Sequence, residues 1–89
     1  MHRQTIYFSG RVQGVGFRYT ALNIAIGCDV NGYVRNLHDG RVELVMEGPD
    51  DEMSRVVQCL RSKMNGNIRN VHAEVGPATG EFNYFAIKH

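Results

Sequence analysis

The stretch Ser9-Gly10-Arg11-Val12-Gln13-Gly14-Val15-Gly16-Phe17-Arg18 is the most informative part of this sequence. Its three glycines stand between an alternating apolar segment and a helical stripe, which predicts a loop joining a strand to a helix. Glycine permits unusual backbone angles, so successive N–H groups of such a loop can point into one concave nest. A helix that begins near Arg18 adds free N–H groups and a partial positive charge. From spacing alone, an anion cradle and a plain tight turn both fit.

The loop does not match the common nucleotide-binding loops. It lacks the Lys-Ser/Thr ending of the Walker loop. It resembles Gly-x-Gly-x-x-Gly only loosely, and a chain of 89 residues is too short for the doubly wound sheet of that motif. Arg18 offers a guanidinium fork that matches phosphate oxygens, and its alternative is a solvated surface arginine.

The residues next to the loop predict a strand and a helix. Ile6, Phe8 and Val12 alternate with polar residues, as in a strand that runs into the loop. An apolar stripe from Arg18 to about Cys28 has helical spacing.

Farther along the chain, turn residues separate two short strands and a second helix. Asp39-Gly40 lies between the segments 32–36 and 42–46, which is a strong hairpin signal. Gly48-Pro49-Asp50 predicts the start of the second helix, with Asp50 as its N-cap, and Asn65-Gly66-Asn67 predicts its end.

Two last strand-like segments lie near 71–75 and 82–88. The order is therefore strand, helix, strand, strand, helix, strand, with one extra short strand. Two helices on one face of a mostly antiparallel sheet of four to five strands bury these stripes economically. We expect an α+β fold, a ferredoxin-like α/β sandwich, in one domain that covers residues 1–89.

Composition narrows the class of partner. The formal net charge of +1 suggests no broad surface for duplex nucleic acid or anionic membrane, although a local pocket for a small anion fits it. No apolar run approaches the roughly 20 residues that span a bilayer. The amino end, MHRQTIYFSG, lacks a signal-peptide pattern, so we expect a cytoplasmic protein.

Cysteine and histidine predict no metal site. Cys28 and Cys59 are too few for a disulfide scaffold, and we expect two half-buried thiols. A bridge between them stays open, because both are expected on helices that cover the same sheet. The four histidines show no ligand spacing.

The run GRVQGVGFR at 10–18 is followed, eighteen residues after its last arginine, by Asn36 within GYVRNLHDGRVEL. This pairing resembles the acylphosphatase family, and the resemblance covers nearly the whole chain. It implies a hydrolase of carboxyl–phosphate anhydrides that needs neither metal nor cofactor. Its substrates would be small acyl phosphates, with inorganic phosphate as product and inhibitor.

The resemblance also implies the site residues. Arg18 would bind the phosphoryl group, and Asn36 would orient the attacking water. The alternative for Asn36 is a turn residue that closes its hairpin. Phe17 is expected to fill the core beneath the loop with its ring. The residues expected to bind phosphate, mostly through backbone N–H groups, are Gln13, Gly14, Val15, Gly16, Phe17 and Arg18.

Two positions depart from the family pattern. Tyr33 stands where tryptophan is usual, which should affect packing more than chemistry. Asp29 stands where glycine commonly closes the first helix. Aspartate can adopt the left-handed cap conformation at a cost of about 1 kcal/mol, so this position bears on stability or on local shape.

Two other functions compete with the hydrolase. One is a phosphate- or carbamoyl-phosphate-binding module of the same fold that does not catalyse, as in larger maturation proteins; retention of Asn36 argues against it. The other is an RNA-binding sandwich, which would need exposed aromatic residues and a basic sheet face. We therefore expect a monomeric enzyme with no nucleic-acid or membrane partner.

Overall fold

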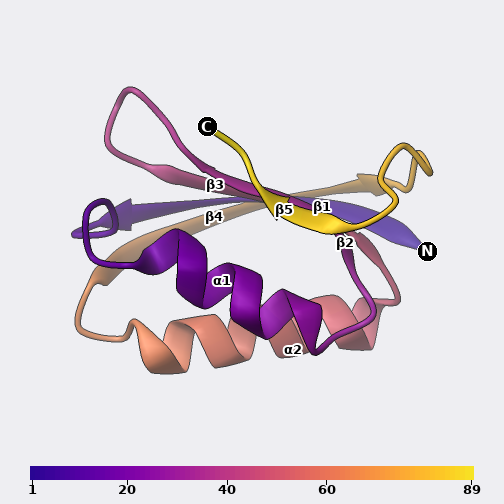
Figure 1. The fold of residues 1–89 in the computed structure, drawn as a ribbon, viewed down its shortest axis with the longest axis horizontal. Coiled ribbons are helices and arrows are strands. Elements are labelled where there is room, and N and C mark those ends of the chain that lie inside the picture. Colours follow the sequence, from indigo (N-terminus) through magenta and orange to yellow (C-terminus); the bar gives the residue numbers. More distant parts are fainter.

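The computed structural model describes residues 1–89 as a five-stranded sheet with two helices packed on one face (Figure 1). The strand order is β4-β1-β3-β2-β5, and every neighbouring pair is antiparallel except β2 and β5. The predicted ferredoxin-like α+β sandwich is thus confirmed. Its elements are β1 (His2–Gly10), α1 (Phe17–Ile26), β2 (Asn31–Asn36), β3 (Val42–Gly48), α2 (Asp50–Lys63), β4 (Ile68–Pro77) and β5 (Phe85–Ile87).

The start of α2 differs from the prediction in its capping residue. Pro49 occupies the N-cap position and no side chain caps the helix, so the assignment of Asp50 as N-cap is wrong. Asp50 is instead the first helical residue, and it begins an acidic first turn that favours the helix dipole. The fixed φ of proline, −62° here, already sets the chain direction from which the helix starts.

The end of α1 also differs. The helix closes at Ile26 with Gly27 as C-cap, and no residue other than glycine has a positive φ. Asp29 therefore does not adopt the left-handed conformation, and the local shape of this turn differs instead. The backbone N–H of Asp29 donates to the Glu52 carboxylate at 2.8 Å, which ties this turn to the first turn of α2 without any left-handed residue.

The core lies between the sheet and the two helices. Ile6 and Phe8 of β1 point into it because alternate strand residues face the same side. The predicted helical stripes fill the other side, and each large buried side chain contributes roughly 1.5–3 kcal/mol. Their fully buried members are Ala21, Ala25, Met53, Val56 and Leu60.

Phe17 anchors the first residue of α1 in this core. Its ring is 2% exposed and lies 5.1 Å from the ring of Phe8, centroid to centroid. The expectation that Phe17 packs beneath the loop is confirmed. The loop from β1 into α1 is therefore fixed at both ends, by the sheet at Gly10 and by the core at Phe17.

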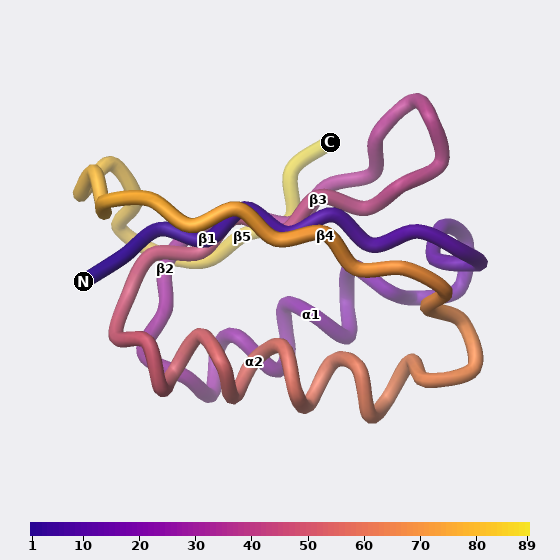
Figure 2. Tube along the Cα trace, turned by 180° about the vertical axis from the view of Figure 1, so that it is seen from behind, coloured from indigo at the N-terminus to yellow at the C-terminus, as the bar shows by residue number.

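The loop and the β2–β3 hairpin project from the same end of the molecule, which both ribbon and trace show (Figures 1 and 2). Register explains this placement. Phe8 pairs with Val42, and Val42 pairs with Asn36, so the carboxyl ends of β1 and β2 lie on either side of the start of β3.

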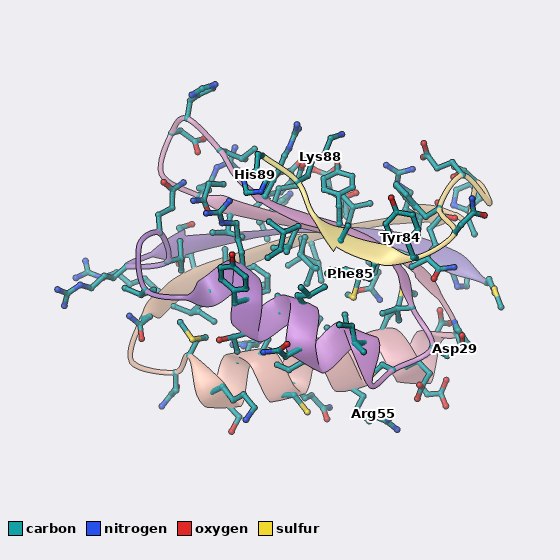
Figure 3. All side chains as sticks on the ribbon, viewed as in Figure 1. Asp29, Arg55, Tyr84, Phe85, Lys88 and His89 are labelled. Atoms are coloured by element: carbon teal, nitrogen blue, oxygen red, sulfur yellow. The ribbon has the colours of Figure 1, made fainter.

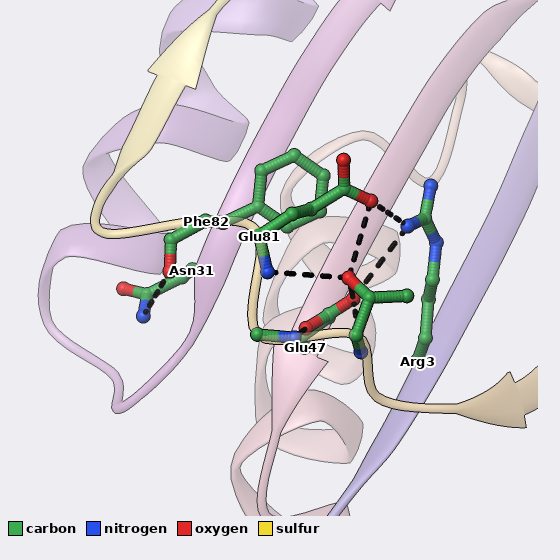
Figure 4. Close-up of polar contacts among 7 residues, drawn as sticks. Arg3, Asn31, Glu47, Glu81 and Phe82 are labelled. Atoms are coloured by element: carbon green, nitrogen blue, oxygen red, sulfur yellow. Dashed lines mark hydrogen bonds and ion pairs between the residues drawn. The ribbon is translucent and has the colours of Figure 1, made fainter.

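The opposite end of the sheet is held by a buried carboxylate (Figure 4). Glu47 is 7% exposed, and it accepts hydrogen bonds from Thr79 N–H at 3.0 Å, Thr79 Oγ1 at 2.7 Å and Gly80 N–H at 2.9 Å. Arg3 pairs with both Glu47 and Glu81. Burial acts to raise the pKa of Glu47, but these hydrogen bonds outweigh it and lower the pKa below its usual value. The carboxylate thus fastens the β4–β5 connection to β3.

We predict that Glu47→Gln lowers the free energy of unfolding at pH 7 by about 1–3 kcal/mol, because an amide cannot accept from all three donors. A lowered pKa in the folded state stabilises the protein above the ordinary glutamate pKa, and that stability is lost as the pH falls through the folded-state pKa. Urea unfolding should therefore show the difference between the two proteins shrinking below about pH 4. Exposed Glu74→Gln is the control, and a Glu47→Gln difference that stays constant down to pH 3 contradicts this account.

Candidate active site

The loop between β1 and α1 adopts the backbone shape of an anion nest. Gly14 and Gly16 have φ of 75° and 79°, both in the left-handed region. Such residues, alternating with others, turn neighbouring N–H groups toward one side. Gly16 is also the N-cap of α1, so the free amides of the first helical turn follow it directly.

Gln13 fastens this loop to the β2–β3 hairpin. Its side-chain amide donates to the carbonyl of Leu37 at 2.8 Å and to that of Arg41 at 2.9 Å. The sequence predicts that Gln13 acts mostly through its backbone N–H, and it does not predict this side-chain contact. No local pattern signals it, because the acceptors lie 24 and 28 residues farther along the chain.

The hairpin itself is closed by backbone and side-chain bonds. Leu37 N–H donates to the Arg41 carbonyl at 2.8 Å, and the Asp39 carboxylate accepts from the Arg41 backbone at 3.1 Å. The hydrogen bonds from Arg41, backbone first, lower the pKa of Asp39 below its usual value. The Asp39-Gly40 turn is thus confirmed.

A hollow of about 170 Å³ lies between the loop, the start of α1 and the end of β2. Since a water molecule takes up roughly 30 Å³ in the liquid, the hollow has room for a tetrahedral oxyanion and a water. Arg18 and Asn36, which come from separate parts of the chain, share it. Its lining residues are Val12, Gly14, Gly16, Phe17, Arg18, Tyr19 and Asn36.

Not every expected residue lines this hollow, and one unexpected residue does. Gln13 and Val15 are absent from its lining, and the Val15 side chain is exposed. Tyr19 contributes although the sequence analysis did not select it. A residue directly after Arg18 on a helix carries no signal of its own, since its position depends on how α1 meets the sheet.

Asn36 is the last residue of β2 and pairs with Val42 of β3. It does not sit in the turn and does not have a positive φ, so the alternative role as a turn residue fails. Asn36 is half-buried, and its pairing with Val42 holds the backbone that carries the carboxamide.

Arg18 has no carboxylate partner. Its guanidinium donates to Nδ1 of His89 at 3.4 Å, and the carboxyl-terminal segment that carries His89 passes over the sheet near the start of α1 (Figure 3). Arg35, in contrast, pairs with buried Glu43 at 2.7 Å. Arg11 makes no ion pair. The half-buried guanidinium of Arg18 is therefore available to an anion in the hollow.

The remaining candidate ligands do not gather into a second centre. Cys28 and Cys59 are free thiols that line a groove between α1 and α2. No three histidine, cysteine, aspartate or glutamate side chains are arranged to hold a metal ion. None of the helices combines the length and apolar character required to cross a membrane.

Comparisons with known proteins identify the family of this chain. The family model described as acylphosphatase matches residues 4–87. An acylphosphatase of Roseiflexus sp. (strain RS-1) is 41% identical over 88 residues, which cover 98% of this chain and 95% of the relative. The crystal structure of the acylphosphatase from Bacillus subtilis matches with a TM-score of 0.90 at 31% identity, covering 100% of both chains.

A larger protein contains the same fold as one part. The T. kodakarensis HypF structure matches with a TM-score of 0.85 at 31% identity, and the match covers 100% of this chain but 12% of that protein. The family model and the full-length relatives together lead to one conclusion: the chain belongs to the acylphosphatase family.

Proposed function

We propose that this chain hydrolyses small acyl phosphates, with the phosphate seated in the loop, Arg18 as its cation and Asn36 as the orienter of water. The observation that carries the proposal is the hollow in which the loop glycines, Arg18 and Asn36 meet. Phosphate would be held by backbone N–H groups of residues 13–18.

The reaction needs few side chains. An acyl phosphate is already activated, because its leaving group is a carboxylate of low pKa. The enzyme has to hold the phosphoryl group, align a water in line with the leaving group and neutralise charge on the equatorial oxygens. Loop amides and the Arg18 fork meet the first and third needs in a site that is already organised.

Asn36 meets the second need. Its side-chain oxygen is an acceptor that can fix one proton of the attacking water. The water oxygen bonds to phosphorus as the bond to the acyl oxygen breaks, and the products are a carboxylate and inorganic phosphate. A carboxamide is no base, so the water proton passes to a phosphoryl oxygen of the substrate.

The wider assignments are proposals of the same kind. We propose one domain over residues 1–89, acting as a monomer in the cytoplasm on small acyl phosphates, with no nucleic-acid or membrane partner. The two free thiols fit a reducing compartment. The competing function is a binding module that does not turn over its ligand, and Asn36 in the hollow supports the enzyme instead.

The open sheet face supports the same choice against RNA binding. Tyr7 and Tyr33 lie on it, but both are covered by cations of the protein: Arg41 lies 4.6 Å from the Tyr7 ring and Lys88 lies 4.6 Å from the Tyr33 ring. Glu43 is buried beside Tyr33, and its carboxylate accepts a hydrogen bond from the Tyr33 hydroxyl at 3.0 Å. RNA bases stack on exposed aromatic rings, so rings that are covered by cations and lie beside a carboxylate do not favour RNA binding.

We predict that the purified protein hydrolyses benzoyl phosphate, followed by loss of its ultraviolet absorbance, at equal rates with and without EDTA. The site described above uses only amides, a guanidinium and a carboxamide. Binding of inorganic phosphate without hydrolysis would favour the binding module.

Arg18→Ala should lower kcat/KM for benzoyl phosphate at least about 100-fold, because it removes the one cation in the hollow. Competitive inhibition by inorganic phosphate should weaken at the same time. Arg55→Ala, on the exposed surface of α2, is the matched control and should stay near the parent rate. Near-normal activity of Arg18→Ala rules out this role.

Asn36→Ala should lower kcat by about 100-fold with little change in phosphate inhibition, since water is oriented mainly in the transition state. Asn31→Ala, at the other end of β2, controls for loss of a strand asparagine. If inhibition by phosphate weakens as much as kcat falls, Asn36 holds the loop and does not position water.

A further inference from the structure

Most lysine and arginine side chains that lack a carboxylate partner lie at one end of the molecule. Of the ten lysine and arginine residues in the chain, Arg3, Arg35, Arg41 and Arg55 form ion pairs. Lys88 lies over Tyr33 on the open sheet face. The others belong to segments that meet at the loop. Besides Arg18 in the hollow, these are Arg11, Arg61, Lys63 and Arg69, which we call the loop-end cations; all four are exposed.

The sheet register and the helix direction explain this gathering. Arg11 follows β1, and its backbone N–H donates to the Asn67 carbonyl at 2.8 Å. Arg69 lies one residue beyond Ile68, which pairs with Gly10, and Arg11 and Arg69 line one open hollow beside the loop. Lys63 ends α2, from which the chain passes directly into β4.

The carboxylates gather at the other end. Asp29 and Arg55 mark that end, where α1 finishes, far from the loop (Figure 3). Near the loop only Asp39 and Glu43 are acidic, and both pair with arginines. The acidic residues of the far end are Asp29, Glu47, Asp50, Asp51, Glu52 and Glu81. The remaining one, Glu74, lies within β4 opposite Thr5 of β1 and contacts His72 at 3.2 Å.

The two ends of the molecule are far apart, so an anion at the loop is affected by the charges near the loop and not by the net charge of the whole protein. The long axis measures 31 Å, whereas the screening length at physiological salt is about 8 Å. Carboxylates at the far end are therefore screened from an anion at the loop, while the loop-end cations are not. The net charge of +1 conceals a strongly positive end around the hollow.

We propose that the loop-end cations draw anions toward the loop and make the enzyme favour acyl phosphates whose acyl group carries further negative charge. The inference rests on the proposed function. A positive rim around a cleft raises the local concentration of an anionic substrate before any contact forms. A second negative group on the acyl part lies outside the hollow, where this rim attracts it as well.

The test compares benzoyl phosphate with 4-carboxybenzoyl phosphate, which has the same ring and one more negative charge. The variant is Lys63→Gln/Arg69→Gln, neither residue being in the hollow. At about 10 mM ionic strength the variant should show kcat/KM for benzoyl phosphate reduced about fivefold, with kcat unchanged. Its preference for the carboxylated substrate should fall a further twofold or so, and both effects should vanish at about 0.5 M salt.

A second variant separates local from total charge. Adding Asp50→Asn and Asp51→Asn at the far end restores the parent net charge to the Lys63→Gln/Arg69→Gln protein. At about 0.15 M ionic strength, where the screening length is about 8 Å, we expect kcat/KM to stay below the parent value, because those positions are screened from the loop. Urea unfolding checks that both variants are folded. Recovery of kcat/KM in the fourfold variant overturns the inference.

Failure of this inference can be told apart from failure of the proposed function. If the parent hydrolyses benzoyl phosphate and the charge variants match it for both substrates at low salt, the inference is wrong and the hydrolase stands. If the parent hydrolyses nothing, calorimetry with inorganic phosphate still applies. Weaker phosphate binding by Lys63→Gln/Arg69→Gln at low salt then supports the attraction, and equal binding overturns it.

Discussion

The pairing of β3 between β1 and β2 is the constraint from which the site follows. It places the end of β1 and the end of β2 on either side of one strand start, with Phe8, Val42 and Asn36 in register. The loop that leaves β1 and the carboxamide that ends β2 must then face the same space. A shift of one residue in the β2–β3 pairing would turn Asn36 to the other face of the sheet.

Side chains that bond to backbone groups hold the two irregular connections that strand pairing does not hold. At the loop end, Gln13 joins the loop to the hairpin through the carbonyls of Leu37 and Arg41. At the far end, Glu47 receives the amides of Thr79 and Gly80. Each is a side chain that satisfies irregular backbone, which a small core cannot fix by packing alone.

Acidic and basic side chains are concentrated at opposite ends of the molecule. Helix α2 begins with acidic residues and ends with Lys63, and its carboxyl end delivers the chain to β4 beside the loop. The arrangement that favours the helix dipole therefore also places cations around the loop between β1 and α1. The acidic first turn and basic last turn of α2 thus stabilise the helix and also make the potential at the loop more positive.

Local patterns were enough to predict the helices and strands and to select the candidate site residues. Periodicity located both helices and the strands, and the glycine-rich loop with Arg18 and the hairpin with Asn36 are legible as short motifs. Contacts between distant segments were not legible. The Gln13 clamp, the place of Tyr19 in the hollow and the gathering of free cations depend on strand register and helix packing. Local propensity acts over a few neighbours along the chain, whereas these features exist only once segments far apart in sequence are brought together by folding.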